Sequence, residues 1–187
     1  MELILASASP RRKELLTFTG IPFTVLSSDA AECSVDDPAE TVILNACSKC
    51  GAIARNHPGS IVLGADTVVY LPGRKEILGK PRNEDDARRM LHLLNGNEHR
   101  VYTGVCVSGP LGENKAYDAA EVVFDRIPDD VIDGYIASGE YKGKAGAYAI
   151  QGSASRFVRR VNGSVTCVIG LPMHLVREML LPYGLLL

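Results

Sequence analysis

The sequence predicts an α/β fold in which a mixed, twisted sheet carries helices on both faces. Residues 60–71 form a long apolar run without alternation, which is typical of a strand covered on both faces. Short runs rich in Val and Ile alternate with segments whose apolar residues recur at helical spacing. With 187 residues, 46% of them hydrophobic and 22% charged, the chain is too apolar for disorder. From this length we expect either one domain or two small lobes that share a core, over residues 1–187.

The first half of the chain predicts strands and helices in turn. Ser9 is a candidate N-cap and Pro10 suits the first helical position, so a strand over residues 2–5 leads directly into a helix that ends near Phe18. Asp37 and Pro38 begin a longer helix in the same way, ending near Asn56. Its apolar stripe is Ala39, Val42, Ile43, Ala46, Cys50 and Ile53. Two further strands are predicted over residues 23–26 and 60–71.

The second half mixes strands with shorter helices. Asn83 can cap a helix that ends at Asn95-Gly96 and buries Ala87, Met90, Leu91 and Leu94. Strands over residues 100–108 and 116–124 flank a turn-rich segment, 109–114. The pattern then predicts a helix over residues 129–138 and a loop over 139–146. It also predicts a hairpin in which 156–161 pairs with 164–169 across Asn162-Gly163. Pro172 opens a last helix that turns Leu175, Val176, Met179 and Leu180 inward.

Charge and hydropathy exclude several classes of protein. Twenty Lys and Arg residues stand against 22 Asp and Glu residues, so we expect no stable binding to nucleic acid. Asp66 interrupts the most apolar stretch, and no run reaches the ~18 to 20 residues of a membrane span. The N-terminal segment places an acidic residue before its apolar run and arginines after it, opposite to a secretory signal. Five cysteines form no even-numbered framework, so we expect reduced thiols and a cytoplasmic protein.

A phosphate-binding site is predicted where the first strand meets the first helix. Ser7, Ser9, Arg11 and Arg12 gather at one helix N-terminus, whose free N–H groups and dipole favour anions. Guanidinium groups match phosphate oxygens with paired donors. The alternative is a well-capped helix with two solvated arginines.

Asp66 is the second candidate, because it lies within the most apolar strand. A buried carboxylate without a partner costs several kcal/mol. A divalent metal, a lysine or a transferable proton could supply that partner, and Lys49 and Lys80 are the candidate lysines. The alternative is a structural strand-end aspartate that backbone amides satisfy.

Gln151 is the third candidate, at the end of the glycine-containing segment 142–151. Its amide can make two hydrogen bonds to an edge such as that of uracil or thymine. The alternative is that Gly143 and Gly146 belong to a glycine-rich connection between lobes.

The cysteines and histidines give weaker signals. Cys47 and Cys50 match C-x-x-C but lie inside a helical pattern without a second ligand pair, so Cys50 is assigned to the core. The four histidines are scattered and are expected at the surface or as satisfied buried groups: His57, His92, His99 and His174.

Five motifs together resemble the Maf family of nucleoside triphosphate pyrophosphatases: ASASPRRKELL, LNACSKCGAIA, GADTVV with KPR after it, KAGAYAIQG and NGSVTCVIGLP. They span essentially the whole chain. The resemblance implies hydrolysis between the α- and β-phosphates, which gives a nucleoside monophosphate and pyrophosphate, with a divalent metal, Mg²⁺ or Mn²⁺. It also implies an active cleft between two lobes and a homodimer.

The resemblance carries over to individual residues. Asp66 matches the family's proposed proton acceptor, and Ser7, Arg12, Glu32, Lys49 and Lys80 match its polar cleft. Arg11, Thr67 and Gln151 match the positions that mark the branch acting on dTTP and UTP; the sister branch, acting on methylated guanine nucleotides, carries Trp, Gln and Glu there. The chain departs from the family at residues 153–155, where relatives often have a second glycine, and at Cys33, Cys47 and Cys50.

The expected function is therefore removal of dTTP, UTP or modified pyrimidine nucleotides from the pool. Lys49, Lys80 and Arg12 would stabilise charge on the phosphates. Glu32 is the expected metal ligand, and Asp66 is either the proton acceptor or a second ligand. The alternative function is a noncatalytic nucleotide-binding regulator of cell division or septum formation.

Overall fold

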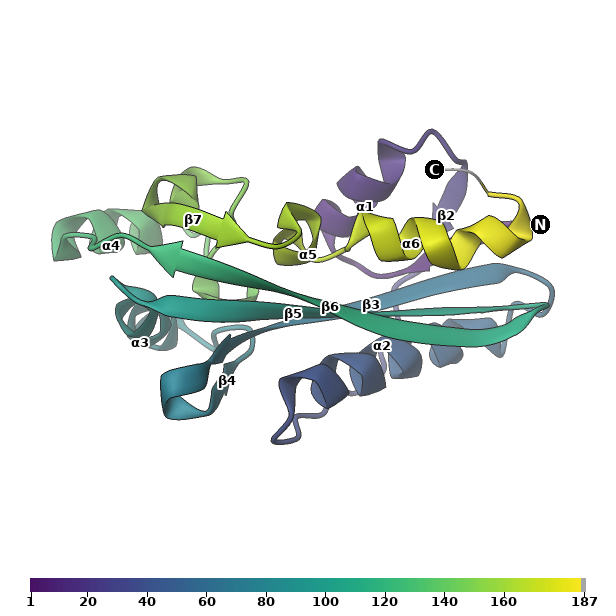
Figure 1. Cartoon of the computed structure of the whole chain (residues 1–187), viewed down its shortest axis with the longest axis horizontal. Coiled ribbons are helices and arrows are strands. Elements are labelled where there is room, and N and C mark those ends of the chain that lie inside the picture. The colour runs from purple at the N-terminus through teal and green to yellow at the C-terminus, as the bar shows by residue number, and fades with distance from the viewer. Residues whose placement is uncertain (186–187) are drawn as a thin grey trace. The chain divides into compact units, whose positions relative to one another are not determined.

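The computed structural model describes residues 1–185 and confirms the α/β class. The described residues form one seven-stranded mixed sheet in the order β2-β1-β3-β5-β6-β7, with β4 paired to β3 (Figure 1). Strand β1 pairs in parallel with β2 and β3, whereas β4 is antiparallel to β3 and β7 is antiparallel to β6. The strands are β1 (Leu3–Ala6), β2 (Phe23–Val25), β3 (Ile61–Leu71), β4 (Glu76–Leu78), β5 (Glu98–Gly109), β6 (Gly112–Phe124) and β7 (Val158–Asn162).

The helices begin where their capping residues predict. Ser9, Asp37 and Asn83 each accept a backbone hydrogen bond at the start of α1, α2 and α3. The helices are α1 (Pro10–Thr17), α2 (Pro38–Ala54), α3 (Glu84–Leu94), α4 (Asp129–Ala137), α5 (Val165–Ile169) and α6 (Met173–Leu180). Within residues 1–185, no helix has both the length and the apolarity needed to cross a membrane.

The chain is divided between two compact units. The first contains residues 1–66 and 103–118 and the chain from Gly170 onward; the second contains residues 67–102 and 119–169. Strands β3, β5 and β6 contribute residues to both units, and the boundary on β3 falls between Asp66 and Thr67.

In the first unit, helices cover both faces of the sheet (Figure 1). Successive β1 residues point to opposite faces: Leu3 and Leu5 pack in a cluster with α6, whereas Ile4 and Ala6 pack in a cluster with α2. Helix α2 lies very close to β3. A Cβ atom added at Gly64 would lie 2.5 Å from the Ala46 carbonyl oxygen. Glycine therefore allows α2 to approach the strand that carries Asp66.

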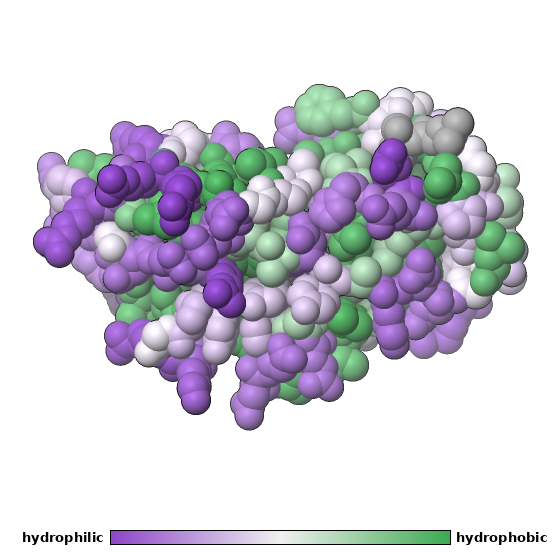
Figure 2. Space-filling view, in the orientation of Figure 1, coloured by the Kyte–Doolittle hydropathy of each residue, from purple (hydrophilic) through white to green (hydrophobic). Residues whose placement is uncertain are grey.

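In the second unit, α3 and α4 contact each other and contribute to one core. Edge-to-face aromatic contacts join Phe124 to His99, Tyr148 and Phe157. His99 is fully buried, and its Nε2 atom lies 2.9 Å from the Tyr148 hydroxyl. The expectation of a satisfied buried histidine is therefore met at Nε2 only, because the buried Nδ1 atom of His99 has no hydrogen-bond partner among residues 1–185. The exposed Arg159 and Arg160 belong to β7, where Figure 2 shows strongly hydrophilic residues.

The structure differs from the predicted elements in three places. Residues 164–169 do not pair as a hairpin strand but form α5, because the Ser164 hydroxyl accepts a hydrogen bond from the Cys167 amide and Cys167 is buried. This tertiary burial overrides the β-branched composition of the segment. The turn predicted over 109–114 is only Pro110-Leu111, with strand on either side. Strand β4 lies in a segment where the sequence pattern predicts no strand.

Candidate active site

The centre of the candidate site is an ion-pair cluster in the first unit. Asp66 lies on β3 and is only 4% exposed. Lys49 projects from α2, and its Nζ atom lies 2.6 Å from Asp66 Oδ1 and 2.8 Å from Glu32 Oε1. Glu32 comes from the segment between β2 and α2 and is partly open to solvent. A single ammonium group therefore holds two carboxylates, and the alternative of an Asp66 satisfied by backbone amides is wrong.

One face of α2 fixes this arrangement. Thr41, Asn45 and Lys49 follow one another at four-residue intervals, so their side chains lie along one side of the helix. The Asn45 amide donates to Asp66 Oδ2 at 3.0 Å and to the Cys33 carbonyl at 2.9 Å, and its oxygen accepts from the Cys33 amide. Thr41 makes two further hydrogen bonds to the backbone of Val35.

These contacts identify functional residues that the sequence patterns did not single out. Asn45 orients both Asp66 and the segment that carries Glu32, and Thr41 anchors the same segment. The signal that could have found them is the repeat of polar residues at 41, 45 and 49 beside the apolar stripe of the helix.

Arg12 is a further charged residue of the candidate site in the first unit. It is buried; its Nε atom donates to the Gly170 carbonyl at 2.7 Å and its Nη1 atom to Ser7 Oγ at 3.2 Å. Burial lowers the pKa of Arg12, whereas Asp66 and Glu32 raise it. Arg12 is therefore a fixed guanidinium within electrostatic range of both carboxylates, and the alternative of two solvated arginines is wrong for this residue.

Ser9 and Arg11 belong to the same helix start. Ser9 Oγ accepts from the Arg12 amide, and the Ser9 amide in turn donates to Ser7 Oγ at 3.2 Å. Arg11 is half-buried and lowers the pKa of Arg12 by repulsion. The predicted phosphate-binding residues thus lie on one helix N-terminus.

The remaining predicted site residues lie in the second unit. Thr67 directly follows Asp66 on β3 and is half-buried, whereas Lys80 and Gln151 are exposed. Their convergence with the first unit on one cleft stays a prediction.

The turn that follows Gln151 is held by Glu140. The Ser153 amide lies 3.0 and 3.1 Å from the two Glu140 carboxylate oxygens, and its hydroxyl donates to Oε2 at 2.6 Å. Burial raises the pKa of Glu140, but these hydrogen bonds outweigh it, and the pKa lies below its usual value. A Cβ atom at Gly152 would overlap Glu140 Oε1, so a larger residue at this position would displace the carboxylate from its present contact. Ser153 belongs to the segment 153–155, and both its amide and its hydroxyl make this contact.

The carboxylate pair fits a divalent metal. Hard cations such as Mg²⁺ prefer oxygen ligands and are often held by only one or two carboxylates together with substrate phosphates. Glu32 and Asp66 offer such oxygens, and both contact Lys49. Asn45 holds the Asp66 oxygen that does not contact Lys49, as a supporting residue around a metal ligand does.

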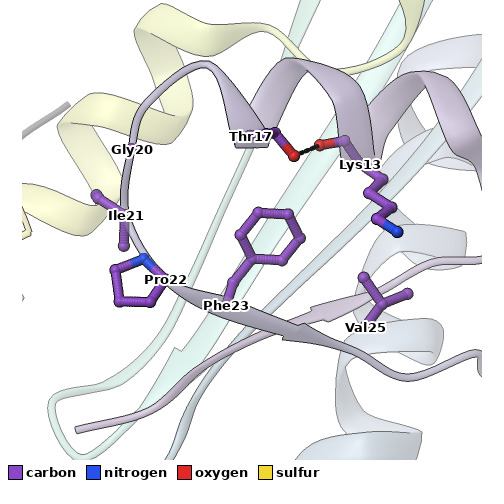
Figure 3. Close-up of a pocket in the computed structure, with 7 residues that line it drawn as sticks. All are labelled: Lys13, Thr17, Gly20, Ile21, Pro22, Phe23 and Val25. Carbon is purple, nitrogen blue, oxygen red and sulfur yellow. Dashed lines mark hydrogen bonds between the residues drawn. The ribbon is translucent and has the colours of Figure 1, made fainter.

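A separate open pocket of about 590 Å³ lies between α1 and β2 and contains none of the predicted site residues (Figure 3). Its lining includes the ring of Phe23 and the side chains of Lys13 and Val25, and Thr17 donates to the Lys13 carbonyl across its upper edge. This lining offers no carboxylate, so the pocket is distinct from the Glu32–Lys49–Asp66 cluster.

Comparison with known proteins decides the family. Residues 2–182 match the family described as "Maf-like protein". This chain belongs to the Maf family. It is 45% identical over 181 residues to a protein named "dTTP/UTP pyrophosphatase" from Bacillus cereus (strain B4264), covering 95% of this chain and 94% of that protein. A protein of the same name from Bacillus thuringiensis subsp. konkukian (strain 97-27) matches with the same identity and coverage.

A solved structure, "Crystal structure of protein VC0702 from Vibrio cholerae", is more distant from this Maf protein. The alignment of the two chains has a TM-score of 0.36 and 12% sequence identity, and it covers 74% of this chain and 68% of the solved one. This similarity is too low to establish a shared fold. In this Maf protein, Arg12 contacts Ser7 and Lys49 contacts Asp66 within the first unit, and charge interactions of Arg12 with Asp66 and Glu32 link the two groups.

Proposed function

We propose that this Maf protein hydrolyses dTTP and UTP between the α- and β-phosphates, giving the nucleoside monophosphate and pyrophosphate. The observation that carries the proposal is the Glu32–Lys49–Asp66 cluster beside the buried Arg12, in a chain 45% identical over 95% of its length to proteins named for this activity. Modified pyrimidine nucleotides are further candidate substrates.

The start of α1 would bind the phosphates. Its free N–H groups and dipole favour anions, and Arg11 adds a second guanidinium beside the fixed one of Arg12. Because Arg12 is buried and held by Gly170 and Ser7, it would meet the phosphates without first losing side-chain entropy. Lys49 and Lys80 would stabilise the charge that develops on the transferred and leaving phosphates.

Asp66 would act on the attacking water in one of two ways. As proton acceptor it would take the proton through the oxygen that faces Lys49, while Asn45 holds the other oxygen. As a metal ligand it would join Glu32. The metal, Mg²⁺ or Mn²⁺, would supply charge neutralisation and a more acidic water. Glu32→Gln is expected to raise the metal concentration required for turnover, and an unchanged metal dependence would contradict its role as ligand.

Selection of the base would fall to Arg11, Thr67 and Gln151. The Gln151 amide can pair with the imide edge of thymine or uracil, and the Glu140–Ser153 contact would hold the turn beside it. The other parts of the proposal are a cytoplasmic enzyme, a homodimer and a single catalytic domain over residues 1–187, with no stable binding to nucleic acid.

The test is pyrophosphate release from dTTP, UTP, CTP, GTP and 7-methyl-GTP with Mg²⁺ or Mn²⁺. Rapid release from dTTP and UTP is expected from the unmodified protein, with at least a ~10²-fold loss in Asp66→Asn. Asp85→Asn, which alters an exposed carboxylate in the second unit, serves as the matched control and should retain activity.

Two other outcomes are informative. A preference for a guanine nucleotide would overturn the assignment of Arg11, Thr67 and Gln151 but keep the reaction. Nucleotide binding without pyrophosphate release would favour the alternative function, a noncatalytic regulator.

A further inference from the structure

Cys47, Cys106 and Glu113 form a cluster that the proposed reaction does not use. One sulfur or carboxylate oxygen from each residue lies within 4.8 Å of the other two. The residues come from α2, β5 and β6, and all three belong to the first unit. Within residues 1–185, this is the one group of three or more His, Cys, Asp or Glu side chains close enough to share an ion.

The fold, rather than sequence spacing, assembles this cluster. Cys47 and Cys50 are three residues apart on α2, and both pack in the apolar cluster that contains Cys106. In the sequence, the C-x-x-C motif does not predict a metal site, because no second pair of ligands lies near it. Strand β5 supplies Cys106, and the start of β6 supplies Glu113.

The cluster has a buried side and an open side. Cys106 is buried, Cys47 is half-buried and Glu113 is exposed. An ion could therefore reach the two sulfur atoms from solvent past Glu113.

Burial and hydrogen bonding both favour the protonated form of the Cys47 and Cys106 thiols. Burial, and then the hydrogen-bonded Cys106, raise the pKa of Cys47 to about 12. The hydrogen bond with Cys50, and then burial, raise the pKa of Cys106. Any ion that binds here must displace protons, so its affinity must rise with pH.

We propose that Cys47, Cys106 and Glu113 form a binding site for a thiophilic divalent cation, with Zn²⁺ as the best match and Cd²⁺ as its spectroscopic substitute. Zn²⁺ accepts thiolate and carboxylate ligands in tetrahedral geometry, and three protein ligands leave one position for water. Cys50 is not part of this group: its sulfur is not among the ligand atoms that lie within 4.8 Å of one another, and its thiol donates to the Val62 carbonyl at 3.2 Å. Mg²⁺ and Mn²⁺ prefer oxygen ligands, so this site differs in metal preference from the Glu32–Asp66 pair.

Binding involves no oxidation. Two S–H bonds break, two metal–sulfur bonds form, and both protons pass to the solvent. The ion would connect α2 to β5 and so hold the helix that carries Asn45 and Lys49.

The test is titration of the reduced protein with Cd²⁺, followed by sulfur-to-cadmium charge-transfer absorbance in the ultraviolet. One Cd²⁺ per chain is expected. Calorimetry in two buffers with different ionisation enthalpies is expected to give two protons released per ion, and the melting temperature should rise with Cd²⁺ concentration.

Matched variants locate the site. Cys47→Ser should abolish most of the absorbance. Glu113→Gln changes an exposed side chain without disturbing the core and should weaken binding by at least about 10-fold, because it removes one of the three proposed ligands. Cys33→Ser removes an exposed thiol outside the cluster, and Asp66→Asn alters the other candidate metal site; both should bind as the unmodified protein does.

The proposal is overturned if the reduced protein does not bind Cd²⁺, or if Cys47→Ser and Glu113→Gln bind it unchanged. Loss of the absorbance in Cys33→Ser would also overturn it, because the ion would then lie on the exposed thiol.

Discussion

Lys49 is the residue on which the charge balance of the candidate site depends. Its ammonium is nearly buried and contacts both Asp66 and Glu32. Removing one partner of a buried ion pair leaves the other charge unpaired, which is far more costly than losing an exposed pair. Lys49 therefore has a structural role in addition to the one proposed for it in the reaction.

Lys49→Met is expected to lower the free energy of unfolding by about 3 kcal/mol, because Asp66 would stay buried without its cation. Glu32→Gln should cost less than about 1 kcal/mol, since Glu32 is 42% exposed. Urea denaturation of both variants measures the difference. Equal losses in the two would mean that Asp66 finds another cation when Lys49 is absent.

For single residues, the sequence identifies the charged Asp66 and Lys49 but not Asn45, whose amide orients Asp66. Burying the carboxylate of an aspartate inside an apolar strand costs free energy unless a cation pairs with it, so the sequence points to Lys49 as a candidate partner. Asn45 gives no such signal, because an amide on a helix is equally common at the surface. Its three hydrogen bonds depend on how the segment around Cys33 returns to α2, which no local pattern specifies.

Among the elements, α2 is the one whose position matters most for the site. It carries Asn45 and Lys49, and it reaches Asp66 because Gly64 has no side chain. A shift of this helix would change the distances from Lys49 and Asn45 to Asp66.

Gly64→Ala is expected to destabilise the protein by about 3 kcal/mol and to reduce pyrophosphate release, because the new Cβ would press on the Ala46 carbonyl and on Cys50. Gly51→Ala is the matched control within α2. A Cβ there meets nothing within 4 Å, and alanine favours a helix, so stability should rise by up to about 1 kcal/mol. Thermal unfolding of both variants tests the pair; a neutral Gly64→Ala would show that α2 can move aside.

For the whole molecule, His99 is expected to govern stability in mild acid. Desolvation lowers its pKa from 6.5 to about 3, so the folded protein keeps the ring neutral while the unfolded chain protonates it. The contribution of the neutral ring to the free energy of unfolding is complete above pH 6.5 and is lost as the pH falls towards 3. Between pH 7 and pH 4 the loss amounts to about 3 kcal/mol.

Denaturant unfolding at several pH values measures this dependence. His99→Gln keeps a neutral polar group and removes the titration, so its stability should vary much less between pH 6.5 and about pH 4. Asp86 and Glu140, whose pKa values are lowered, add their own losses at lower pH. If His99→Gln and the unmodified protein gave the same slope, His99 would not be the group responsible.

The fold is predictable where local chemistry and tertiary burial agree. Ser9, Asp37 and Asn83 begin helices as their side chains predict, and the apolar run predicted as a strand over residues 60–71 forms the central strand β3. The prediction is wrong at 164–169, where β-branched residues favour a strand but Ser164 caps a helix and Cys167 is buried. It also misses β4, which is three residues long and exists through its pairing with β3.

The interleaved order of the chain restricts how such a protein can acquire a new specificity. Neither unit is a continuous stretch of sequence, since the chain passes repeatedly from one to the other. A single peptide bond joins Asp66, proposed for the reaction, to Thr67, proposed for choice of base. No recombination event between two genes could exchange one unit as a cassette and leave the other intact. Divergence towards a different nucleotide must therefore proceed by substitutions in place, one codon at a time.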